Sequence, residues 1–183
     1  SSDNGPAVYD GYYDGCYEKN GNHQPSGPYR GGKYSAWEGG CRVPFIVSGP
    51  AWVTPGVSDA IVSQADLLAS FAELTGAKSS GKYHVDSQNL IGLLTGKSDE
   101  GREHVVLQGV GIKSIRKGPW KYVPPGKVRN KGSIDEIIYD HIGEEGVLFF
   151  LPEDPGETNN LALKYPQIAK ELSLLLETEL SQK

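Results

Sequence analysis

The amino-acid sequence predicts an α/β chain in two parts: a loop-rich piece with one clear helix, followed by a small antiparallel sheet covered by a second helix. Three observations support this division. Apolar residues recur at helical spacing over residues 66–75 and again over 167–181. From residue 104 onward, short β-rich runs alternate with turns that contain glycine. Residues 1–42 follow neither a period of 2 nor one of 3.6, which is typical of functional loops.

The loop-rich part contains three predicted elements. Residues 43–48 form a short apolar run closed by a Gly-Pro turn, and we expect a strand there. A helix is expected from residue 63 or 66 to residue 75, with Gly76 as its stop signal. A shorter helical turn is expected over residues 87–94. The apolar stripe of the longer helix consists of Leu67, Leu68, Phe71 and Leu74.

The second part begins near residue 100 with a predicted antiparallel meander of three short strands. We expect residues 124–132 to form a basic loop and residues 146–151 to form a further strand. Apolar positions over residues 167–181 predict a final helix, and Pro166 suits its first turn. The meander strands are expected over residues 104–108, 112–117 and 120–123.

Composition excludes several classes of protein. The 183 residues carry 18 Lys and Arg against 23 Asp and Glu, a net charge of −5, so the basic excess of a nucleic-acid binder is missing. Charged residues make up 22% and hydrophobic residues 37%, a balance typical of a folded chain. No apolar run approaches the roughly 18 residues that a membrane helix needs. We therefore expect no nucleic-acid partner and no membrane span. The sequence shows no leader of basic and then apolar residues, so we expect no targeting signal in it.

An acid–amide pair, Asp3 and Asn4, stands near the start of the chain, followed by Gly5 and Pro6, which turn the backbone away. Carboxylate and amide oxygens are the ligands that hard divalent cations prefer, so the pair is a candidate metal site. The alternative is an Asx-type turn in which both side chains accept hydrogen bonds from backbone N–H groups. The residues themselves leave both interpretations open.

A second candidate site lies in residues 27–33, where glycines let the backbone approach a ligand. Arg30 and Lys33 supply positive charge there for an anionic group. The segment is similar to a phosphate-binding P-loop, but Tyr34 stands where that pattern requires Ser or Thr, so we reject nucleotide binding. The alternative for Lys33 is a solvated side chain on a turn.

Other polar residues in the first 42 positions have simpler interpretations. His23 lies in the same loop region as the cationic segment and is a candidate substrate contact, the alternative being a structural histidine. Glu38 and Arg42, four positions apart, are interpreted as a salt bridge that shapes the loop. Cys16 and Cys41 allow one disulfide, two free thiols or partners elsewhere, and neither belongs to a metal-type spacing.

The order of several motifs is more specific than any one of them. Residues 2–6 read SDNGP, residues 31–33 read GGK, and residues 37–47 read WEGGCRVPFIV. Further segments with matching patterns are residues 58–68, 116–122 and 148–162. Together these segments strongly resemble the type I sulfatase family, which is arylsulfatase-like and belongs to the alkaline-phosphatase superfamily. The resemblance extends over nearly the whole chain.

The resemblance implies an alkaline-phosphatase-like α/β fold with a C-terminal subdomain of antiparallel sheet and helix. Residues 1–100 would be the C-terminal part of the catalytic domain, and residues 101–183 would be the subdomain. It also implies hydrolysis of sulfate esters. Asp3 and Asn4 match two ligands of the family's calcium ion, and Lys33 matches a catalytic lysine that contacts the substrate sulfate.

The chain also departs from the family pattern. The family's nucleophile is a formylglycine made within a Cys-x-Pro-x-Arg motif, and this sequence contains no such motif and no Met. We therefore expect a C-terminal portion of a sulfatase, inactive alone, in which two ligands do not retain Ca²⁺. Because residues 1–60 would lack sheet neighbours, we expect them to be partly mobile or held by formation of a homo-oligomer.

The expected substrate is a sulfated glycan in preference to a small aryl sulfate, because aromatic and amide side chains suit sugar faces and hydroxyls. Two alternatives stay open: a noncatalytic module that binds anionic glycan through Lys33 and Arg30, and a piece of a related phosphatase or phosphodiesterase. The resemblance implies a periplasmic or secreted protein, or a lysosomal one in a eukaryote. The candidate sugar contacts are His23, Gln24, Tyr29, Tyr34 and Trp37.

Overall fold

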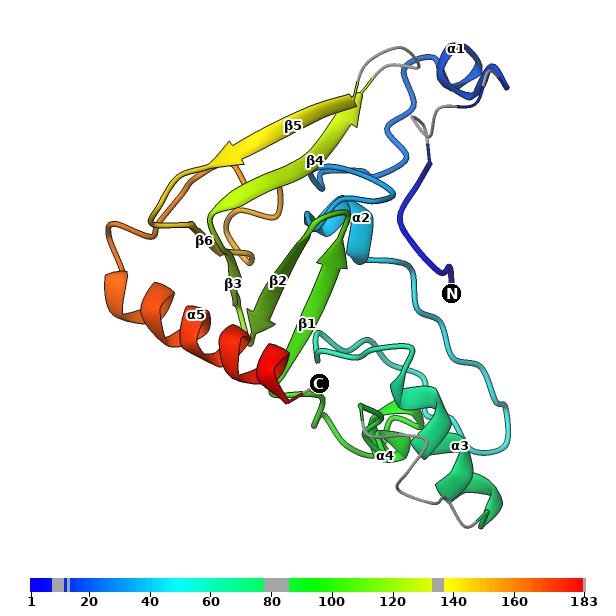
Figure 1. Ribbon diagram of the computed structural model, residues 1–183. Coiled ribbons are helices and arrows are strands. Elements are labelled where there is room, and N and C mark those ends of the chain that lie inside the picture. The colour runs from blue at the N-terminus through cyan, green and yellow to red at the C-terminus, as the bar shows by residue number, and fades with distance from the viewer. Residues whose placement is uncertain (8–11, 13, 78–85, 133–136, 183) are drawn as a thin grey trace. The chain divides into compact units, whose positions relative to one another are not determined.

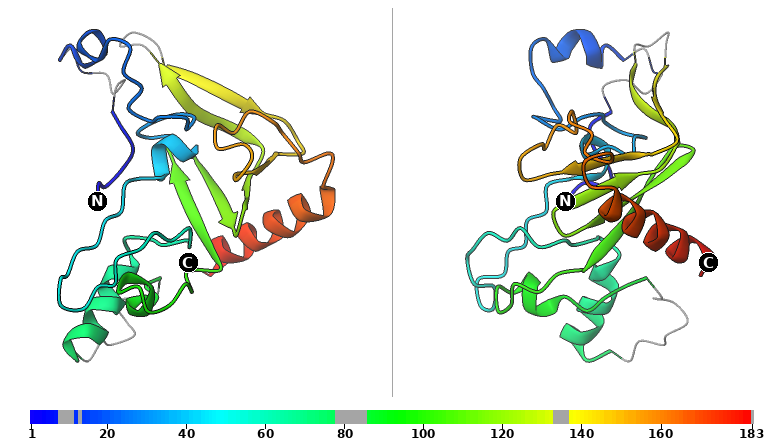
Figure 2. Two further views of the ribbon diagram at one scale, coloured as in Figure 1. Left: turned by 180° about the vertical axis from the view of Figure 1, so that it is seen from behind. Right: turned by 90° about the vertical axis from the view of Figure 1, so that its left-hand side faces the viewer.

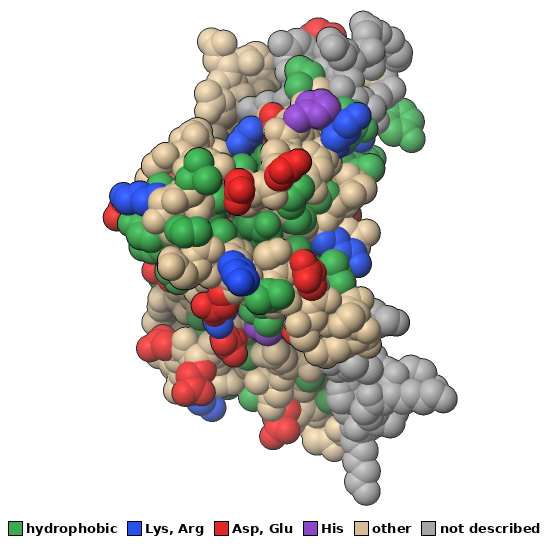
Figure 3. Space-filling model, turned by 60° about the vertical axis from the view of Figure 1, so that its left-hand side comes forward, with side chains coloured by type: hydrophobic (Ala, Val, Ile, Leu, Met, Phe, Trp, Pro, Cys, Tyr) green, Lys and Arg blue, Asp and Glu red, His purple; other side chains and the backbone are tan. Residues whose placement is uncertain are grey.

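The computed structural model describes residues 1–7, 12, 14–77, 86–132 and 137–182. The chain forms two compact units, one built from Ser1–Phe45 with Val106–Lys183 and the other from Ile46–Val105. None of the helices in the described ranges is long and apolar enough to cross a membrane. Figure 3 shows Lys and Arg side chains scattered among acidic and apolar ones on the face in view.

A four-stranded antiparallel sheet with the order β1-β2-β3-β6 is the centre of the first unit (Figure 1). β2 pairs with β3 so that Ile115 faces Tyr122, and β3 pairs with β6 so that Lys121 faces Phe149. Gly118 turns between β2 and β3 with a φ of 53°, in the left-handed region that favours glycine. The predicted meander and the further strand are therefore confirmed. The strands are β1 (His104–Gly109), β2 (Ile112–Lys117), β3 (Trp120–Val123) and β6 (Val147–Phe150).

Helix α5 (Pro166–Ser181) covers one face of this sheet, as the two views of Figure 2 show. Its buried positions, Ala169, Leu172 and Leu176, recur at helical spacing, and they pack against the side chains of Ile115 and Leu148. Full burial of such a leucine stabilises the fold by about 1.5–3 kcal/mol. The predicted final helix is confirmed, with Pro at its first position.

The opposite face of the sheet is covered by a part of the chain for which the sequence predicted no packing. Ala36 and Trp37 are fully buried there, together with Val123, Phe149 and other apolar side chains of the sheet. The Trp37 ring meets the Phe149 ring edge-on, with centroids 5.9 Å apart. Two short helices, α1 (Cys16–Asn20) and α2 (Glu38–Cys41), lie within this otherwise irregular segment.

A β-hairpin stands where the sequence predicted a basic loop. β4 (Gly126–Gly132) pairs with β5 (Ile137–Ile142), and Val128 of β4 is fully buried. The prediction of a loop over residues 124–132 was wrong because polar residues surround a single buried valine. That leaves too little apolar alternation to mark a strand.

The second unit contains helices α3 (Asp66–Thr75) and α4 (Ile91–Leu94). α3 ends at Gly76, which has a φ of 67°, and this confirms the predicted stop. The expected turn over residues 87–94 is helical only in its last four residues.

The predicted helix α3 is confirmed, but its apolar stripe is largely uncovered, and the prediction of a strand over residues 43–48 was wrong. The side chains of Leu68, Phe71 and Leu74 on α3 are exposed, whereas Asp66 and Ser70 of the same helix are buried. Residues 43–48 form no strand, because no segment in the described ranges pairs with them, and Ile46 is 83% exposed. Apolar pattern alone does not supply the neighbouring strand or helix that burial requires.

Candidate functional site

Two hydrogen bonds hold the acid–amide segment against the glycine-rich loop. The Lys33 N–H donates to the Pro6 carbonyl at 2.9 Å, and the Gly5 N–H donates to the Gly40 carbonyl at 3.0 Å. A Cβ at Gly5 would lie only 1.8 Å from the Gly39 carbonyl oxygen, so the two backbones approach as closely as glycine allows. The structure therefore joins the segments that carry Asn4 and Lys33.

The acid–amide pair has a local hydrogen-bond frame. The Ser2 hydroxyl donates to the Asn4 carbonyl at 2.9 Å, and the Asn4 amide Nδ2 donates to the Gly5 carbonyl at 2.8 Å. With its nitrogen used in this way, the side chain of Asn4 presents Oδ1 as the atom that could bind a cation, beside the exposed carboxylate of Asp3.

These oxygens have the right chemistry for Ca²⁺, but they are few. Calcium takes six to eight oxygen ligands. Within the part of the chain that the structure describes, no group of three His, Cys, Asp or Glu side chains is arranged to hold a metal ion. Asp3 and Asn4 therefore fit as two members of a calcium shell rather than as a complete site.

Lys33 follows two glycines and is half-buried. Its ammonium lies 5.1 Å from the centre of the Tyr34 ring, and the Arg129 guanidinium lies 4.5 Å from the same ring. Tyr34 has a φ of 76°, an uncommon conformation for a residue with a side chain. Two cations around one ring give this loop a positive character that suits an anion.

Arg30 is already engaged within the protein. One guanidinium nitrogen lies 3.0 Å from the Asp140 carboxylate, and the other donates to the Glu157 carbonyl at 2.8 Å. The same guanidinium stacks over the Trp37 ring at 4.1 Å, and the Trp37 indole N–H donates to Asp140 at 2.9 Å. These contacts hold the loop on the β4–β5 hairpin.

His23 is exposed, and its backbone bonds run to Asn20 within its own loop. The predicted pair of Glu38 and Arg42 is confirmed, with 3.7 Å between carboxylate and guanidinium. Cys41 and Cys16 are not joined by a disulfide, and the Cys41 thiol donates to the Ser35 carbonyl at 3.4 Å. Burial raises the pKa of Cys41 to about 11, which leaves its thiol protonated near neutral pH.

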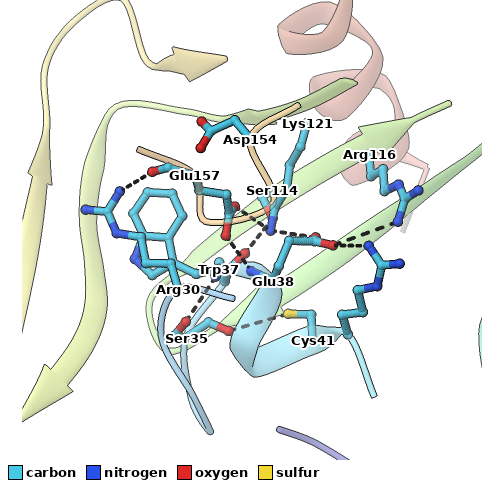
Figure 4. Close-up of polar contacts among 12 residues, drawn as sticks. Arg30, Ser35, Trp37, Glu38, Cys41, Ser114, Arg116, Lys121, Asp154 and Glu157 are labelled. Carbon is cyan, nitrogen blue, oxygen red and sulfur yellow. Dashed lines mark hydrogen bonds and ion pairs between the residues drawn. The ribbon is translucent and has the colours of Figure 1, made fainter. Parts of the chain in front are cut away.

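Behind the glycine-rich loop lies a group of buried charges that sequence reasoning missed, drawn in Figure 4. We call it the Lys121 cluster, and it consists of Glu38, Lys121 and Glu157. The Lys121 ammonium lies 3.0 Å from the Glu38 carboxylate and 2.8 Å from the Glu157 carboxylate. The second oxygen of Glu157 accepts the backbone N–H of Glu38 at 2.6 Å. None of the three residues is more than 1% exposed.

Burial and charge act in opposite directions in this cluster. Burial penalises the ionised form of Glu38, but Lys121, Arg116 and Arg42 outweigh it and lower the pKa of Glu38. Burial would lower the pKa of Lys121, yet the two carboxylates raise it. Glu157 is less surrounded by cations, and burial raises its pKa. The cluster thus retains a charged lysine in the interior.

A cavity of about 680 Å³ adjoins the acid–amide segment. Asn4 and Gly5 form one part of its lining, and Tyr29 and Arg42 form another. The Arg42 guanidinium lies 4.9 Å from the centre of the Tyr29 ring. An aromatic face beside a cation gives this cavity surfaces that suit an anionic sugar.

Comparisons with known proteins place these features in a family. A family model described as Sulfatase matches residues 1–77. An N-acetylgalactosamine-6-O-sulfatase of Bacteroides thetaiotaomicron is 41% identical over 181 residues, which are 97% of this chain and 35% of that protein. Arylsulfatase A of Bos taurus is 30% identical over 183 residues, which cover 93% of this chain and 34% of that protein.

Solved structures agree with these matches. One from work on glycosaminoglycan metabolism by Bacteroides thetaiotaomicron has a TM-score of 0.86 at 40% identity, and the match covers 97% of this chain and 37% of that one. The PsFucS1 sulfatase from Pseudoalteromonas sp. has a TM-score of 0.72 at 21% identity, with coverage of 84% and 32%, and shows the fold alone.

The chain therefore has the mixed α/β fold of the alkaline-phosphatase-like class, as predicted. It belongs to the sulfatase family. It spans about a third of the length of the curated relatives that it matches.

Proposed function

We propose that this chain forms the sulfate-facing and calcium-facing part of a sulfuric ester hydrolase. The observation that carries the proposal is the hydrogen bond from the Lys33 N–H to the Pro6 carbonyl, together with that from Gly5 to Gly40. These bonds bring the backbone of a cationic loop and that of an acid–amide pair together. An anion that is bound beside a divalent cation needs both kinds of group.

Each residue has a distinct task in this proposal. The Lys33 ammonium donates hydrogen bonds to sulfate oxygens and neutralises the negative charge that grows on them as the ester bond breaks. Asp3 and Asn4 supply two oxygen ligands to Ca²⁺, which would withdraw charge from the sulfate when bound. The chain contains no Cys-x-Pro-x-Arg motif, so we assign it no nucleophile. His23 is proposed as a sugar contact. Arg30 is proposed to hold the loop in place through Asp140 and Glu157 and to make no direct contact with the substrate.

A sulfated glycan is the proposed substrate class. One relative, which matches 97% of this chain, is named for sulfate on N-acetylgalactosamine, and the cavity beside Asn4 combines an aromatic ring with a guanidinium. Arylsulfatase A relatives make small aryl sulfates the competing class. By the same similarity we propose a periplasmic or secreted location.

The test uses a chimera in which this chain replaces the matching segment of the Bacteroides thetaiotaomicron relative. We expect turnover of 6-sulfated N-acetylgalactosamine to exceed that of an aryl sulfate. We expect Lys33→Ala to lower kcat/KM by about 10²–10³-fold, the usual cost of removing one group that stabilises a transition-state anion. The 183-residue chain alone is expected to show no turnover.

Lys164→Ala is the control, because the Lys164 ammonium lies 5.2 Å from the ring of the tyrosine that follows it, as that of Lys33 does at 5.1 Å, but Lys164 is exposed and lies outside the candidate site. It should leave kcat/KM within about twofold, as surface substitutions usually do. An active chimera in which Lys33→Ala behaves like Lys164→Ala would refute the role of Lys33. Glycan binding without turnover would favour a noncatalytic binding module.

A further inference from the structure

We propose that Lys121 is a positioning residue that fixes the glycine-rich loop, residues 27–33, from the side of the sheet. It does so by holding helix α2 against the turn that contains Glu157. The effect on catalysis rests on the function proposed above, whereas the effect on the loop itself does not.

The location of Lys121 supports this role first. It lies in the middle of β3, opposite Phe149 of β6, so its side chain shares the sheet face on which Phe149 and Trp37 pack. An aliphatic residue would be expected at such a position. A lysine that is fully buried there needs oxygen partners, and within the described residues Glu38 and Glu157 supply them.

The turn that presents Glu157 is itself firmly held. The Asp154 carboxylate accepts the backbone N–H groups of Thr158 and Asn159, both at 2.9–3.0 Å, and the Thr158 hydroxyl. Glu157 has a φ of 54°, which is uncommon for a residue with a side chain, and its carbonyl accepts a hydrogen bond from Arg30. A constrained turn of this kind offers a fixed anchor point for Lys121.

The connection then runs from α2 to both parts of the candidate site. The Gly39 N–H donates to the Arg30 carbonyl at 2.7 Å, and the Gly40 carbonyl accepts the Gly5 N–H. A Cβ at Gly39 would lie 2.4 Å from the Arg30 carbonyl, and one at Gly40 would lie 2.4 Å from the Gly32 carbonyl. With so little space between the backbones, a shift of α2 must displace the loop that carries Lys33.

Three segments that are distant in sequence therefore meet at the Lys121 ammonium. They are residues 37–40 through Glu38, strand β3 through Lys121 itself, and the turn of residues 154–157 through Glu157. If one of these segments shifted, the ammonium or a carboxylate would be left buried without its partner, which is strongly unfavourable. The proposal thus gives a physical reason for a lysine at position 121.

The first test needs no activity. Amide hydrogen exchange is measured on the 183-residue chain and on Lys121→Met, which keeps the length of the side chain and removes its charge. We expect exchange at the Gly5 and Lys33 amides to accelerate at least tenfold, while the amides of helix α5 keep their protection. Lys117→Met is the matched control, since Lys117 lies on the neighbouring strand and pairs with Glu171 at the surface. Unchanged exchange at Gly5 and Lys33 would overturn the proposal.

A second pair of variants covers the case in which Lys121→Met does not fold. Glu157→Gln keeps an oxygen that can accept the Glu38 N–H, whereas Glu157→Ala removes it. We expect the alanine variant to lose protection at Gly5 and Lys33, and the glutamine variant to recover much of it. Equal exchange in the two variants would count against the proposal.

The catalytic readout uses the chimera described above. Lys121→Met should lower kcat by about tenfold to a hundredfold, the order expected for a displacement of a catalytic group by about 1 Å. In a Lys33→Ala background it should have almost no further effect, because the group that it positions is gone. Additive effects would show that Lys121 serves stability alone. An inactive chimera would bear on the proposed function only, since the exchange measurements stand without it.

Discussion

The two compact units differ in whether the apolar stripe of their longest helix is covered. Helix α5 of the first unit buries Leu172 and Leu176, which are 1% and 4% exposed. Helix α3 of the second unit has an apolar stripe of similar spacing, yet Leu68 and Phe71 are each 53% exposed. An apolar period thus marks a face that can be covered, and whether a partner covers it depends on the rest of the protein.

The second unit buries polar groups beside a few apolar ones: Asp66 and Ser70 are buried along with Ile61, Leu90 and Leu94. The Asp66 carboxylate accepts the backbone N–H groups of Ser63 and Gln88 and lies against the Arg102 guanidinium. The Ser70 hydroxyl accepts the Leu90 N–H at 2.9 Å. The first unit has an apolar core on each face of a sheet, whereas in the second unit hydrogen-bonded groups share the interior with a few apolar side chains.

The largest effect that this comparison predicts is in the first unit. Trp37→Ala should lower the free energy of unfolding by about 3–5 kcal/mol, because it empties a large site next to Phe149. Urea denaturation of the wild type and the variant measures the loss. Trp52→Ala, at a position 48% exposed in the second unit, is the control and should cost much less. Equal losses for the two tryptophans would break the comparison.

In the second unit the sensitive position should be polar. Asp66→Ala should cost about 3–5 kcal/mol, since it leaves the Arg102 guanidinium and two backbone N–H groups without their acceptor. Amide exchange in α3 reports the loss within that unit. Asp66→Asn retains one acceptor oxygen and should recover part of the stability. A negligible cost for Asp66→Ala would mean that apolar contacts hold this unit after all.

Cys41 should react about a hundredfold more slowly than an ordinary thiol, and Cys16 should react first because it is exposed. The pKa of Cys41 rises from an ordinary value of 9.0 to about 11, so its thiolate fraction near pH 8 falls by a factor of about 100. Cys16 is exposed. Alkylation by iodoacetamide, followed by mass spectrometry, should modify Cys16 first, and Cys41 should react faster as pH approaches 11. Similar rates at both thiols would show that the loop around Cys41 opens.

The smallest predicted effect concerns the exposed stripe of α3. Phe71→Ser should change the free energy of unfolding of this chain by no more than about 0.5 kcal/mol, as is usual at exposed positions. Leu172→Ala, at the corresponding kind of position on α5, should cost about 2–5 kcal/mol. A large loss of stability in Phe71→Ser would mean that this face of α3 is covered in solution, and the contrast with α5 would then disappear.

Local signals predicted much of the first unit's sheet. The meander was evident because glycines separate short β-rich runs, and α5 was evident from its apolar spacing and its leading Pro166. The β4–β5 hairpin was missed because Val128 is a lone buried apolar residue among Lys127, Arg129 and Asn130. The sequence of β4 alone does not reveal that β5, which follows it in the chain, pairs with it.

The candidate site was partly predictable. The motif order pointed to Asp3, Asn4 and Lys33, and the structure joins their backbone segments, while their roles remain predictions. The Lys121 cluster could not be foreseen, because a lysine within an aromatic strand is most simply interpreted as facing solvent. Its partners come from segments far away in the sequence, and residue spacing carries no information on such contacts.

The burial of Trp37 and Glu38 beneath the last strand also constrains the order in which the chain can fold. Glu38 and Glu157, which share a hydrogen bond, are 119 positions apart. At ribosomal rates of roughly 5–20 residues per second, the early segment waits on the order of ten seconds for the segment that covers it. During this interval the Trp37 side chain lacks the strand that buries it, and contacts of such wide sequence separation form more slowly than local ones.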